Sequence, residues 1–576
     1  MQTLIDFAAT GTPGSADPLR CAFGAPRQTL VAHRPAQVRP LLEAVQALAR
    51  QGYWCVGYLR YEAAAAFDPA LAVQEADGPL AWFGVHDAPQ AWPDLAVGNS
   101  AIAQWQEALS RSAFDQGMAE IHRAIVDGEL YQLNYTAPLH GTLTGAPRDL
   151  FMALQRAQPG GYAAFIDTGD EQVLSVSPEL FFDWDGERIL ARPMKGTAPR
   201  GATAEIDAAL AAQLLASAKE RAENVMIVDL IRNDLSRVAQ PFSVTVPHLF
   251  QLEALPSVWQ MTSDVEARTR PGTTLADVFA ALFPCGSITG APKVRAMQMI
   301  KSLEPEPRGV YCGAVGVVRP GGAATFNVAI RTVTVQGDAL RCGIGSGITA
   351  DATAEGEWQE WRHKRAFLER ARQPFELLET MALEDGVLRT APEHLARLAR
   401  AAQHFGYPWA ATRVEACLRQ LADSHRQGLW RVRLRLDAHG QAQAEAYAME
   451  VIPTPVTLAL AATAFEAADS EFVRFKTTRR AHYDAFAPHE SGVFDTLLWN
   501  RQGEITECTR GNVALRLDGR WVTPPLRCGL LDGIGRARFL REGRLAEAVV
   551  RVEDLPRATG LAFVNSLRGW LDAVLV

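Results

Sequence analysis

A change of pattern near Gln373-Pro374 constrains the fold of this chain more than any other feature. An acidic helical pattern runs on through Arg365–Arg370 and should stop there, because a proline disfavours helical backbone at the residue before it. A different pattern, Phe375–Met381, begins immediately afterwards. A chain of 576 residues is also too long for one ordinary core. We therefore predict two domains, residues 1–371 and residues 372–576.

Short strand patterns and amphipathic helices alternate in the first part. Gly313–Val318 and Phe326–Ile330 have the composition of buried strands, and no regular strand–helix–strand period connects the elements. This organisation predicts an α+β fold rather than a doubly wound parallel sheet.

Composition and motifs exclude several classes of function. The net charge of −8 gives no electrostatic reason to expect nucleic acid as a partner. No run of about 18 apolar residues predicts a membrane span, and the first residues, Met1–Asp6, do not resemble a signal peptide. The eight cysteines stand singly, without a C-x-x-C pair, which favours a reducing cytoplasm. Gly286–Lys293 and Gly343–Gly347 lack the spacing of the ATP and dinucleotide motifs, so neither nucleotide is predicted.

Three acidic positions raise the question of a bound cation. Glu223 lies on the apolar stripe of a helix predicted over residues 219–238, where burying an unpaired polar group costs about 2–7 kcal/mol. A salt bridge to a core arginine is the simplest explanation of Glu223 alone. Glu357 and Glu360, however, share one helical face and repel each other unless a cation lies between them. Carboxylates also suit Mg²⁺, so the acids leave open both a salt bridge and a metal site.

Several segments together resemble one family. Lys195 lies in Arg192–Thr197, Glu179 follows Ser177-Pro178, and the glycine-rich stretch Gly286–Lys293 comes later. They resemble the chorismate-utilising enzymes, the family of anthranilate, isochorismate and aminodeoxychorismate synthases. Anthranilate synthases carry a small residue where Lys195 stands, so this lysine resembles the aminodeoxychorismate synthase branch. The resemblance implies a β-sandwich with helices as the first domain.

The resemblance also implies roles for individual side chains. Lys195 would add to C2 of chorismate while Glu179 protonates the departing C4 hydroxyl; ammonia would then attack C4 and expel the lysine. Mg²⁺ would be a cofactor held by Glu223 and Glu360, with Glu357 as a third ligand, and it would bind the ring carboxylate of the substrate.

A second group of residues is implied to bind the other end of chorismate. Tyr311 and Arg331 would hold the enolpyruvyl carboxylate, because a planar guanidinium binds a carboxylate through two hydrogen bonds. Backbone N–H groups near Gly345 and Gly347 would assist them.

Two further positions are implied to touch the substrate. Lys293 follows the glycine-rich turn at the start of a predicted helix and would add positive charge, although a solvated lysine explains it equally simply. Gln260 stands where many relatives have a histidine. An amide still donates a hydrogen bond, but it does not titrate near neutral pH.

Residues 375–576 carry a second set of motifs. Glu471–Lys476 alternates like a strand and ends on Lys476, Glu507 follows Ile505-Thr506, and Arg397 lies in a helical pattern. These residues resemble a fold-type IV pyridoxal-phosphate enzyme, specifically an aminodeoxychorismate lyase of α+β fold. The resemblance implies Lys476 as the cofactor-binding lysine and the base that removes the C4 proton. Glu507 would protonate the pyridine nitrogen, Arg397 would bind the phosphate, and Thr380 would assist the expulsion of pyruvate to leave 4-aminobenzoate.

The remaining cofactor contacts come from two turns. Gly529–Ile534 is predicted to open a helix, and the N–H groups at Gly533 and Ile534 suit a phosphate. The resemblance adds Asn565 and Ser566 to that site.

The sequence predicts no glutaminase site in this chain. A glutaminase needs a cysteine on a sharp elbow, and Cys285, in Pro284–Ser287, does not lie in a G-x-C-x-G motif. We therefore expect a separate glutaminase subunit as partner, and a homodimer through the C-terminal domain stays open. The predicted function is a bifunctional enzyme of 4-aminobenzoate synthesis. The alternatives are an anthranilate synthase component I with an aminotransferase-like C-terminal domain, or one whose second half is catalytically silent and only docks partners.

Overall fold

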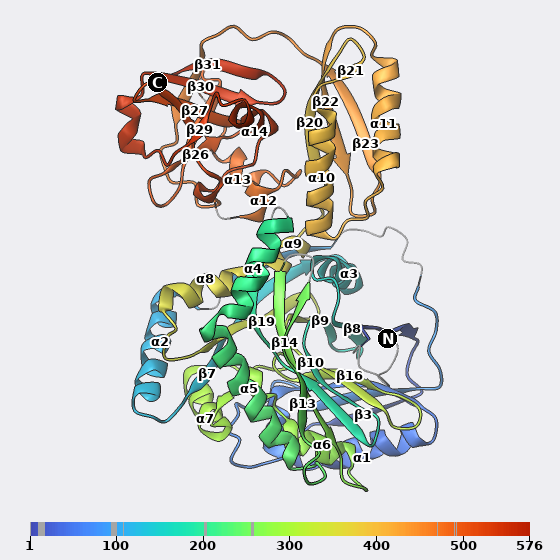
Figure 1. The fold of residues 1–576 in the computed structure, drawn as a ribbon. Coiled ribbons are helices and arrows are strands. Elements are labelled where there is room, and N and C mark those ends of the chain that lie inside the picture. Colours follow the sequence, from blue (N-terminus) through green and yellow to red (C-terminus); the bar gives the residue numbers. More distant parts are fainter. Residues whose placement is uncertain are drawn as a thin grey trace. The chain divides into compact units, whose positions relative to one another are not determined.

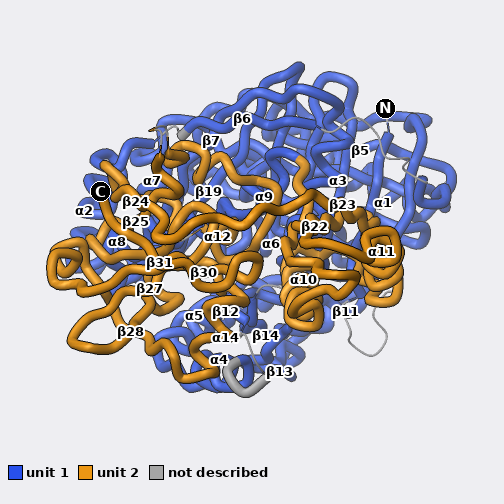
Figure 2. The backbone as a smooth tube through the Cα atoms, turned by 90° about the horizontal axis from the view of Figure 1, so that it is seen from above, with its two compact units in different colours: residues 1–373 blue, residues 374–576 orange. Residues whose placement is uncertain are grey.

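The chain forms two compact units. The computed structural model describes residues 2–9, 18–93, 101–107, 109–200, 204–254, 258–468, 470–488, 490 and 492–576. The units are Met1–Gln373 and Pro374–Val576, coloured separately in Figure 2, whereas the sequence placed the division after residue 371. In the described ranges, no helix is both long and apolar enough to cross a membrane.

Two antiparallel sheets form the frame of the first unit (Figure 1). One has nine strands: β1 (Thr3–Phe7), β2 (Leu19–Phe23), β6 (Ile102–Glu107), β7 (Gln132–Thr144), β8 (Tyr162–Asp167), β9 (Gln172–Ser177), β15 (Gly290–Ala291), β18 (Thr332–Gln336) and β19 (Ala339–Ile348). Their order is β15-β7-β19-β18-β9-β8-β1-β2, and β6 pairs with β7.

The second sheet of this unit has ten strands. They are β3 (Gln28–Ala32), β4 (Trp54–Leu59), β5 (Ala81–His86), β10 (Leu180–Trp184), β11 (Arg188–Arg192), β12 (Met194–Pro199), β13 (Thr245–Ala254), β14 (Val258–Arg268), β16 (Ala314–Val318) and β17 (Ala324–Val328). The order is β12-β14-β11-β10-β17-β16-β4-β5-β3, and β13 pairs with β14.

Helices cover the sheets on their outer sides. The helices are α1 (Pro35–Arg50), α2 (Arg111–Val126), α3 (Pro147–Ala157), α4 (Ala204–Ala216), α5 (Ala218–Ser236), α6 (Leu275–Leu282), α7 (Lys293–Leu303), α8 (Ala354–Lys364) and α9 (Ala366–Ala371). One core lies between the sheets, where Ile5 and Ile166 of the first sheet pack with Val56 and Val315 of the second. Helices α1, α5 and α6 pack on the ten-stranded sheet, and α3, α7 and α8 on the nine-stranded sheet. The predicted α+β sandwich with helices is confirmed.

Helix α5 forms where the apolar stripe predicted a helix. Ser217 caps it by accepting a hydrogen bond from the N–H of Glu220, which satisfies one of the free donors of the first turn. Ile227, Ile231 and Leu235 form its buried face. Helix α5 packs along β12 and β14, at the end of the ten-stranded sheet.

The predicted acidic helix near the end of this unit is two helices. Thr353 caps α8 by accepting from the N–H of Gly356, and the helix ends at Lys364 with Arg365 as its C-cap. Arg365 is also the N-cap of α9, which ends shortly before Pro374 as predicted.

The second unit holds two sheets of different character. The strands are β20 (Leu377–Glu384), β21 (Val387–Leu388), β22 (Leu429–Leu436), β23 (Ala442–Ala448), β24 (Val456–Leu460), β25 (Asp495–Trp499), β26 (Ile505–Cys508), β27 (Asn512–Leu517), β28 (Arg520–Thr523), β29 (Ala546–Glu547), β30 (Gly560–Asn565) and β31 (Gly569–Leu575). Four form the sheet β21-β20-β22-β23, which α10 (Ala391–Phe405) and α11 (Ala411–Ser424) cover. The other eight form the sheet β26-β25-β24-β31-β30-β27-β28-β29, in which some neighbours are parallel.

The segment before Lys476 differs from the prediction. Glu471–Arg474 is a short helix, α12, rather than a strand, because Ser470 caps it by accepting from the N–H of Phe472. The chain becomes extended only afterwards, where the carbonyl of Lys476 accepts a hydrogen bond from the N–H of Leu378 on β20. The lysine is therefore fixed by the neighbouring four-stranded sheet.

Candidate active sites

Lys195 lies where the two sheets of the first unit meet. It stands on β12 of the ten-stranded sheet, and its Nζ lies 3.0 Å from Glu223 Oε2 on α5. Gly347 of the nine-stranded sheet faces the same amine, since a Cβ at this position would lie 2.9 Å from Lys195 Nζ. A side chain at this position would therefore require the amine to move.

Carboxylates surround this amine. Burial by itself lowers the pKa of Lys195, but the charges of Glu223, Glu360 and Glu220 outweigh burial and raise the pKa above its ordinary value. The ammonium form is therefore the stable one. Glu220, one turn before Glu223 on α5, was not selected from the sequence, although its spacing places it on the same helical face.

The three acids predicted as metal ligands have other partners in this structure. Glu223 holds Lys195, Glu360 holds Lys364 at 2.8 Å, and the buried Glu357 accepts a hydrogen bond from a serine hydroxyl. Among the described residues, no three His, Cys, Asp or Glu side chains gather closely enough to hold a metal ion. Their oxygens suit Mg²⁺, but Glu223 and Glu360 would have to exchange a lysine for the ion.

Glu179 is a buried acid that titrates near neutral pH. Ser287 Oγ, in the glycine-rich segment, donates a hydrogen bond of 2.7 Å to Glu179 Oε1. Burial raises the pKa of Glu179 to about 7, although the Ser287 hydroxyl and the charge of Lys195 lower it. At neutral pH both forms of the carboxyl are populated, as a general acid requires.

Arg331 is a cation without an acid partner. It follows β17, and no hydrogen bond or ion pair of its side chain occurs among the described residues. Burial and the nearby Arg370 lower its pKa to about 10. An unpaired guanidinium of this kind suits a carboxylate ligand. Tyr311, on the neighbouring segment, packs its ring against Gly343, where a Cβ would lie 2.0 Å from the ring.

The remaining residues predicted to bind substrate fall into two groups. Gln260 accepts from the hydroxyl of Thr197 and donates to the carbonyl of Gly196, so it lies directly beside the Lys195 segment. The carbonyl of Gly345 accepts from a lysine on α8.

Lys293 instead has a protein partner. Its Nζ lies 2.6 Å from Asp234 Oδ2 and also donates to the carbonyl of Leu282. Both charged side chains are largely buried, so the simple solvated lysine is wrong. The substrate role predicted for Lys293 would require this ion pair to open.

Sequence reasoning missed Gln132. Its side chain is completely buried on β7, and neither amide atom finds a hydrogen-bond partner among the described residues. A Cβ on Gly347 would lie 2.6 Å from Gln132 Nε2, so the amide lies next to the Lys195 amine. A buried amide without partners suits a polar ligand. A glutamine on an apolar strand was the available signal.

Lys476 of the second unit is partly buried and lies near two arginines. Burial, and to a lesser extent the charges of Arg480 and Arg397, lower its pKa to about 8, against the opposing effect of nearby carboxylates. A buried lysine with nearby cations keeps a reactive fraction of neutral amine.

Glu507 has the opposite shift. Burial raises its pKa to about 7, although hydrogen bonds from Tyr483 and Leu531 lower it. The Tyr483 hydroxyl donates to Oε1 at 2.6 Å, and the Leu531 N–H donates to Oε2 at 3.1 Å. These two hydrogen bonds therefore fix the orientation of the Glu507 carboxyl group.

Arg397 is held rigidly at the start of α14 (Ile534–Arg541). Its guanidinium makes two hydrogen bonds to Glu379, of 2.8 and 2.7 Å, and donates to the carbonyl of Asp532 at 2.9 Å. His394 also lies 2.6 Å from Glu379, and these partners hold the pKa of that carboxyl at about 2 despite burial. Neither Glu379 nor His394 was predicted as part of the site.

The other predicted cofactor contacts gather around the same helix. Gly533 is the N-cap of α14, and Ile534 is its first residue. A Cβ on Gly535 would lie 2.6 Å from the backbone of Asn565, so the turn at Asn565 and Ser566 lies against the first turn of this helix. Ser566 Oγ donates to the carbonyl of Thr380 at 3.5 Å. Arg397, a helix N-terminus and this turn together fit a phosphate, which agrees with pyridoxal phosphate.

Each of the two units matches the model of a known protein family. Residues 86–370 match the family model of chorismate binding enzymes, and residues 376–576 match that of class IV amino-transferases. The chain therefore combines a domain of each family. The predicted resemblance to these two classes is confirmed.

Two relatives each match about half of this chain. The chain is 41% identical to aminodeoxychorismate synthase component 1 of Klebsiella aerogenes over 281 residues, which are 49% of this chain and 61% of that protein. It is 36% identical to anthranilate synthase component 1 of Pseudomonas putida over 283 residues, 49% of this chain and 57% of that protein. The matches thus span about three fifths of those relatives. The structure of anthranilate synthase component I from Streptococcus pneumoniae shares the fold, with a TM-score of 0.54 and 24% identity over 64% of this chain and 92% of that chain.

Proposed function

We propose that the protein converts chorismate and ammonia to 4-aminobenzoate in two steps. The first unit would form 4-amino-4-deoxychorismate, and the second would eliminate pyruvate from it. The observation that carries the first step is the amine of Lys195, held against Gly347 and Glu223 within a chorismate-binding domain. Since relatives include anthranilate synthases as well, this lysine is what favours amination at C4.

In the first step Lys195 acts as a nucleophile. Its neutral amine adds to C2, both ring double bonds shift, and the C4 hydroxyl leaves as water with a proton from Glu179. Ammonia then adds at C4, both double bonds shift back, and Lys195 leaves as an amine. Because Glu223 stabilises the ammonium form, this ion pair must open before Lys195 can react. Mg²⁺, on Glu223, Glu357 and Glu360, would supply positive charge for the ring carboxylate of the substrate.

In the second step Lys476 acts as a base. Its pKa of about 8 suits a group that accepts the C4 proton near neutral pH. Pyridoxal phosphate, when bound, supplies an electron sink. Arg397 and the N-terminus of α14 would hold its phosphate, Glu507 would protonate its ring nitrogen, and Thr380 would lie beside Ser566 at the elimination site.

One assay tests both steps. Purified protein with chorismate, Mg²⁺ and ammonium should form 4-amino-4-deoxychorismate, and added pyridoxal phosphate should convert it to 4-aminobenzoate and pyruvate. Chromatography separates these products from anthranilate. Anthranilate as the main product would support the alternative synthase. Formation of 4-amino-4-deoxychorismate without any pyruvate would support a silent second unit.

Ammonia would come from a partner. The relatives are named as component 1 of their enzymes, which supports a separate glutaminase subunit. The purified chain should use ammonium but not glutamine. Turnover with glutamine alone would show that this chain holds a glutaminase site.

A further inference from the structure

A buried ion pair connects three segments of the first active site. Arg308 and Glu304 are each 6% exposed, and the guanidinium donates to both carboxylate oxygens, Nε to Oε2 at 2.8 Å and Nη2 to Oε1 at 2.7 Å. Neither residue belongs to the set predicted from the sequence. Buried pairs of this kind contribute little to stability as a rule, so their other contacts indicate what they do.

The other N–H groups of Arg308 hold two backbone segments. Nη1 donates to the carbonyl of Ile288 at 2.8 Å, and Nη2 donates to the carbonyl of Asn134 at 2.7 Å. Ile288 ends the short helical turn Gly286–Ile288, which presents Ser287 to Glu179. Asn134 lies on β7, two residues after Gln132.

Glu304 completes the connection on β7. Its Oε1 accepts from both the N–H and the hydroxyl of Thr136 at 3.0 Å. The pair thus fixes β7 and the glycine-rich turn relative to each other through fully buried, charge-assisted hydrogen bonds. Tyr311, predicted to bind substrate, comes three residues after Arg308 on the same chain.

We propose that Arg308 and Glu304 are positioning residues that hold the Ser287 hydroxyl against the Glu179 carboxyl and Gln132 beside Lys195. This inference rests on the proposed chorismate amination. The pair touches no reacting atom. It acts by fixing the turn and the strand that carry the groups which do, and misplacement by about 1 Å is costly for such groups.

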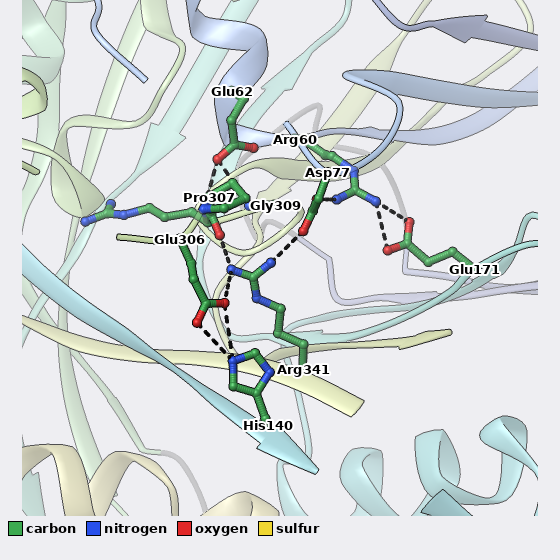
Figure 3. Close-up of polar contacts among 10 residues, drawn as sticks. Arg60, Glu62, Asp77, His140, Glu171, Glu306, Pro307, Gly309 and Arg341 are labelled. Carbon is green, nitrogen blue, oxygen red and sulfur yellow. Dashed lines mark hydrogen bonds and ion pairs between the residues drawn. The ribbon is translucent and has the colours of Figure 1, made fainter. Parts of the chain in front are cut away.

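A second buried arginine in the same unit provides a matched control. Arg60 donates to both oxygens of Glu171, at 2.9 and 2.8 Å, and also to Asp77 (Figure 3). In the part of the chain that the structure describes, the Glu171 carboxylate has hydrogen bonds to Arg60 and Tyr58, and none to β7 or the glycine-rich turn. Glu171→Gln therefore removes an equivalent charge from an equivalent arginine without touching β7 or the glycine-rich turn.

The test is a double-mutant cycle on chorismate consumption with ammonium. Ser287→Ala should lower kcat/KM by about tenfold, because it removes a hydrogen bond to a carboxyl group. In Glu304→Gln, which already lowers kcat/KM by at least as much, Ser287→Ala should cost less than about threefold. In Glu171→Gln it should keep its full effect. Equal effects of Ser287→Ala in both backgrounds would overturn the proposal.

Hydrogen exchange provides a second measurement that does not depend on activity. Amides of residues 286–290 and 132–136 should exchange faster in Glu304→Gln, or in Arg308→Lys if the former does not fold, but not in Glu171→Gln. Unchanged exchange in these segments would also overturn the proposal. If the wild type fails to consume chorismate, the proposed function fails, and the exchange comparison still decides whether the pair fixes these segments.

Discussion

The two units treat their central lysine in opposite ways. Lys195 lies among carboxylates, which outweigh burial and raise its pKa, while Lys476 lies among arginines and burial lowers its pKa to about 8. Both are partly buried, so burial alone does not decide the outcome. The sign of the neighbouring charges does.

Under the proposed mechanism, this difference means that Lys195 must leave its ion pair before it reacts, whereas Lys476 accepts a proton without such a change. The ammonium group of Lys195 does not react while it is paired with Glu223. The reactivity of the first site should therefore depend on a cation, such as Mg²⁺, that competes for this carboxylate. Lys476 needs no such event, since a fraction of its amine is already neutral at pH 7–8. The comparison predicts that changes in the acids around Lys195 alter the reactivity of this lysine, whereas Lys476 reacts without the loss of an ion pair.

Removal of Lys195 should have the largest effect. Lys195→Ala should lower formation of 4-amino-4-deoxychorismate by roughly a thousandfold or more, because the nucleophile of the first step is lost. The residual product should include anthranilate, since C2 is no longer blocked. Lys219→Ala removes a lysine 3.9 Å from the same Glu223 and should change the rate little. An active Lys195→Ala enzyme with an unchanged product would end the nucleophile assignment.

Lys476→Ala should stop the reaction one step later. The first unit keeps all its groups, so chorismate consumption should continue at the wild-type rate while 4-amino-4-deoxychorismate accumulates. Pyruvate release, coupled to lactate dehydrogenase, should fall below detection, because the base of the second step is absent. Wild-type pyruvate release from this variant would remove the second unit from the pathway.

The acids of the first site should have the next largest effect. Glu223→Gln and Glu360→Gln should each weaken Mg²⁺ dependence and chorismate binding together, by about ten- to a hundredfold, if ion and substrate bind as one unit. Titrations with Mg²⁺ at fixed chorismate provide the measurement. Glu355→Gln, an exposed acid on α8, is the control. Wild-type Mg²⁺ titrations in both variants would mean that these acids are partners of lysine only.

The opposite pKa shifts can be measured directly on the apo protein. Amine labelling at increasing pH, followed by mass spectrometry, should modify Lys476 with a midpoint near pH 8. Lys195 should remain protected at that pH because its pKa is raised. Glu223→Gln removes the nearest negative charge and should move labelling of Lys195 to lower pH without changing Lys476. Equal midpoints for the two lysines would refute the comparison.

Most of the architecture could be predicted from the sequence, but few of the side-chain ion pairs and hydrogen bonds in the two sites could be. Apolar periodicity located α5 and the strands β16 and β17, because periodicity follows directly from which face is buried. It misjudged Glu471–Arg474, where the local cap of Ser470 decided the backbone, and local capping is invisible to an alternation count. Motifs selected Lys195 and Lys476 but gave no sign of their different charges, since those depend on side chains that are distant in sequence.

Lys293 tests the comparison at its weakest point. Like Lys195, it forms an ion pair with an acid, here the buried Asp234. Neither Lys293 nor Asp234 is proposed to bind Mg²⁺. The comparison holds that a lysine in a buried ion pair does not contact substrate unless Mg²⁺ or another cation competes for its acid. Lys293→Met should therefore raise the KM for chorismate by less than about threefold. Loss of one partner should instead destabilise the fold by about 3–5 kcal/mol, seen as a lower melting temperature. Arg331→Met provides the contrast, since Arg331 has no acid partner among the described residues and should raise the KM by about tenfold or more. A rise in KM for Lys293→Met as large as that for Arg331→Met would return Lys293 to the substrate site and show that its ion pair opens during the reaction.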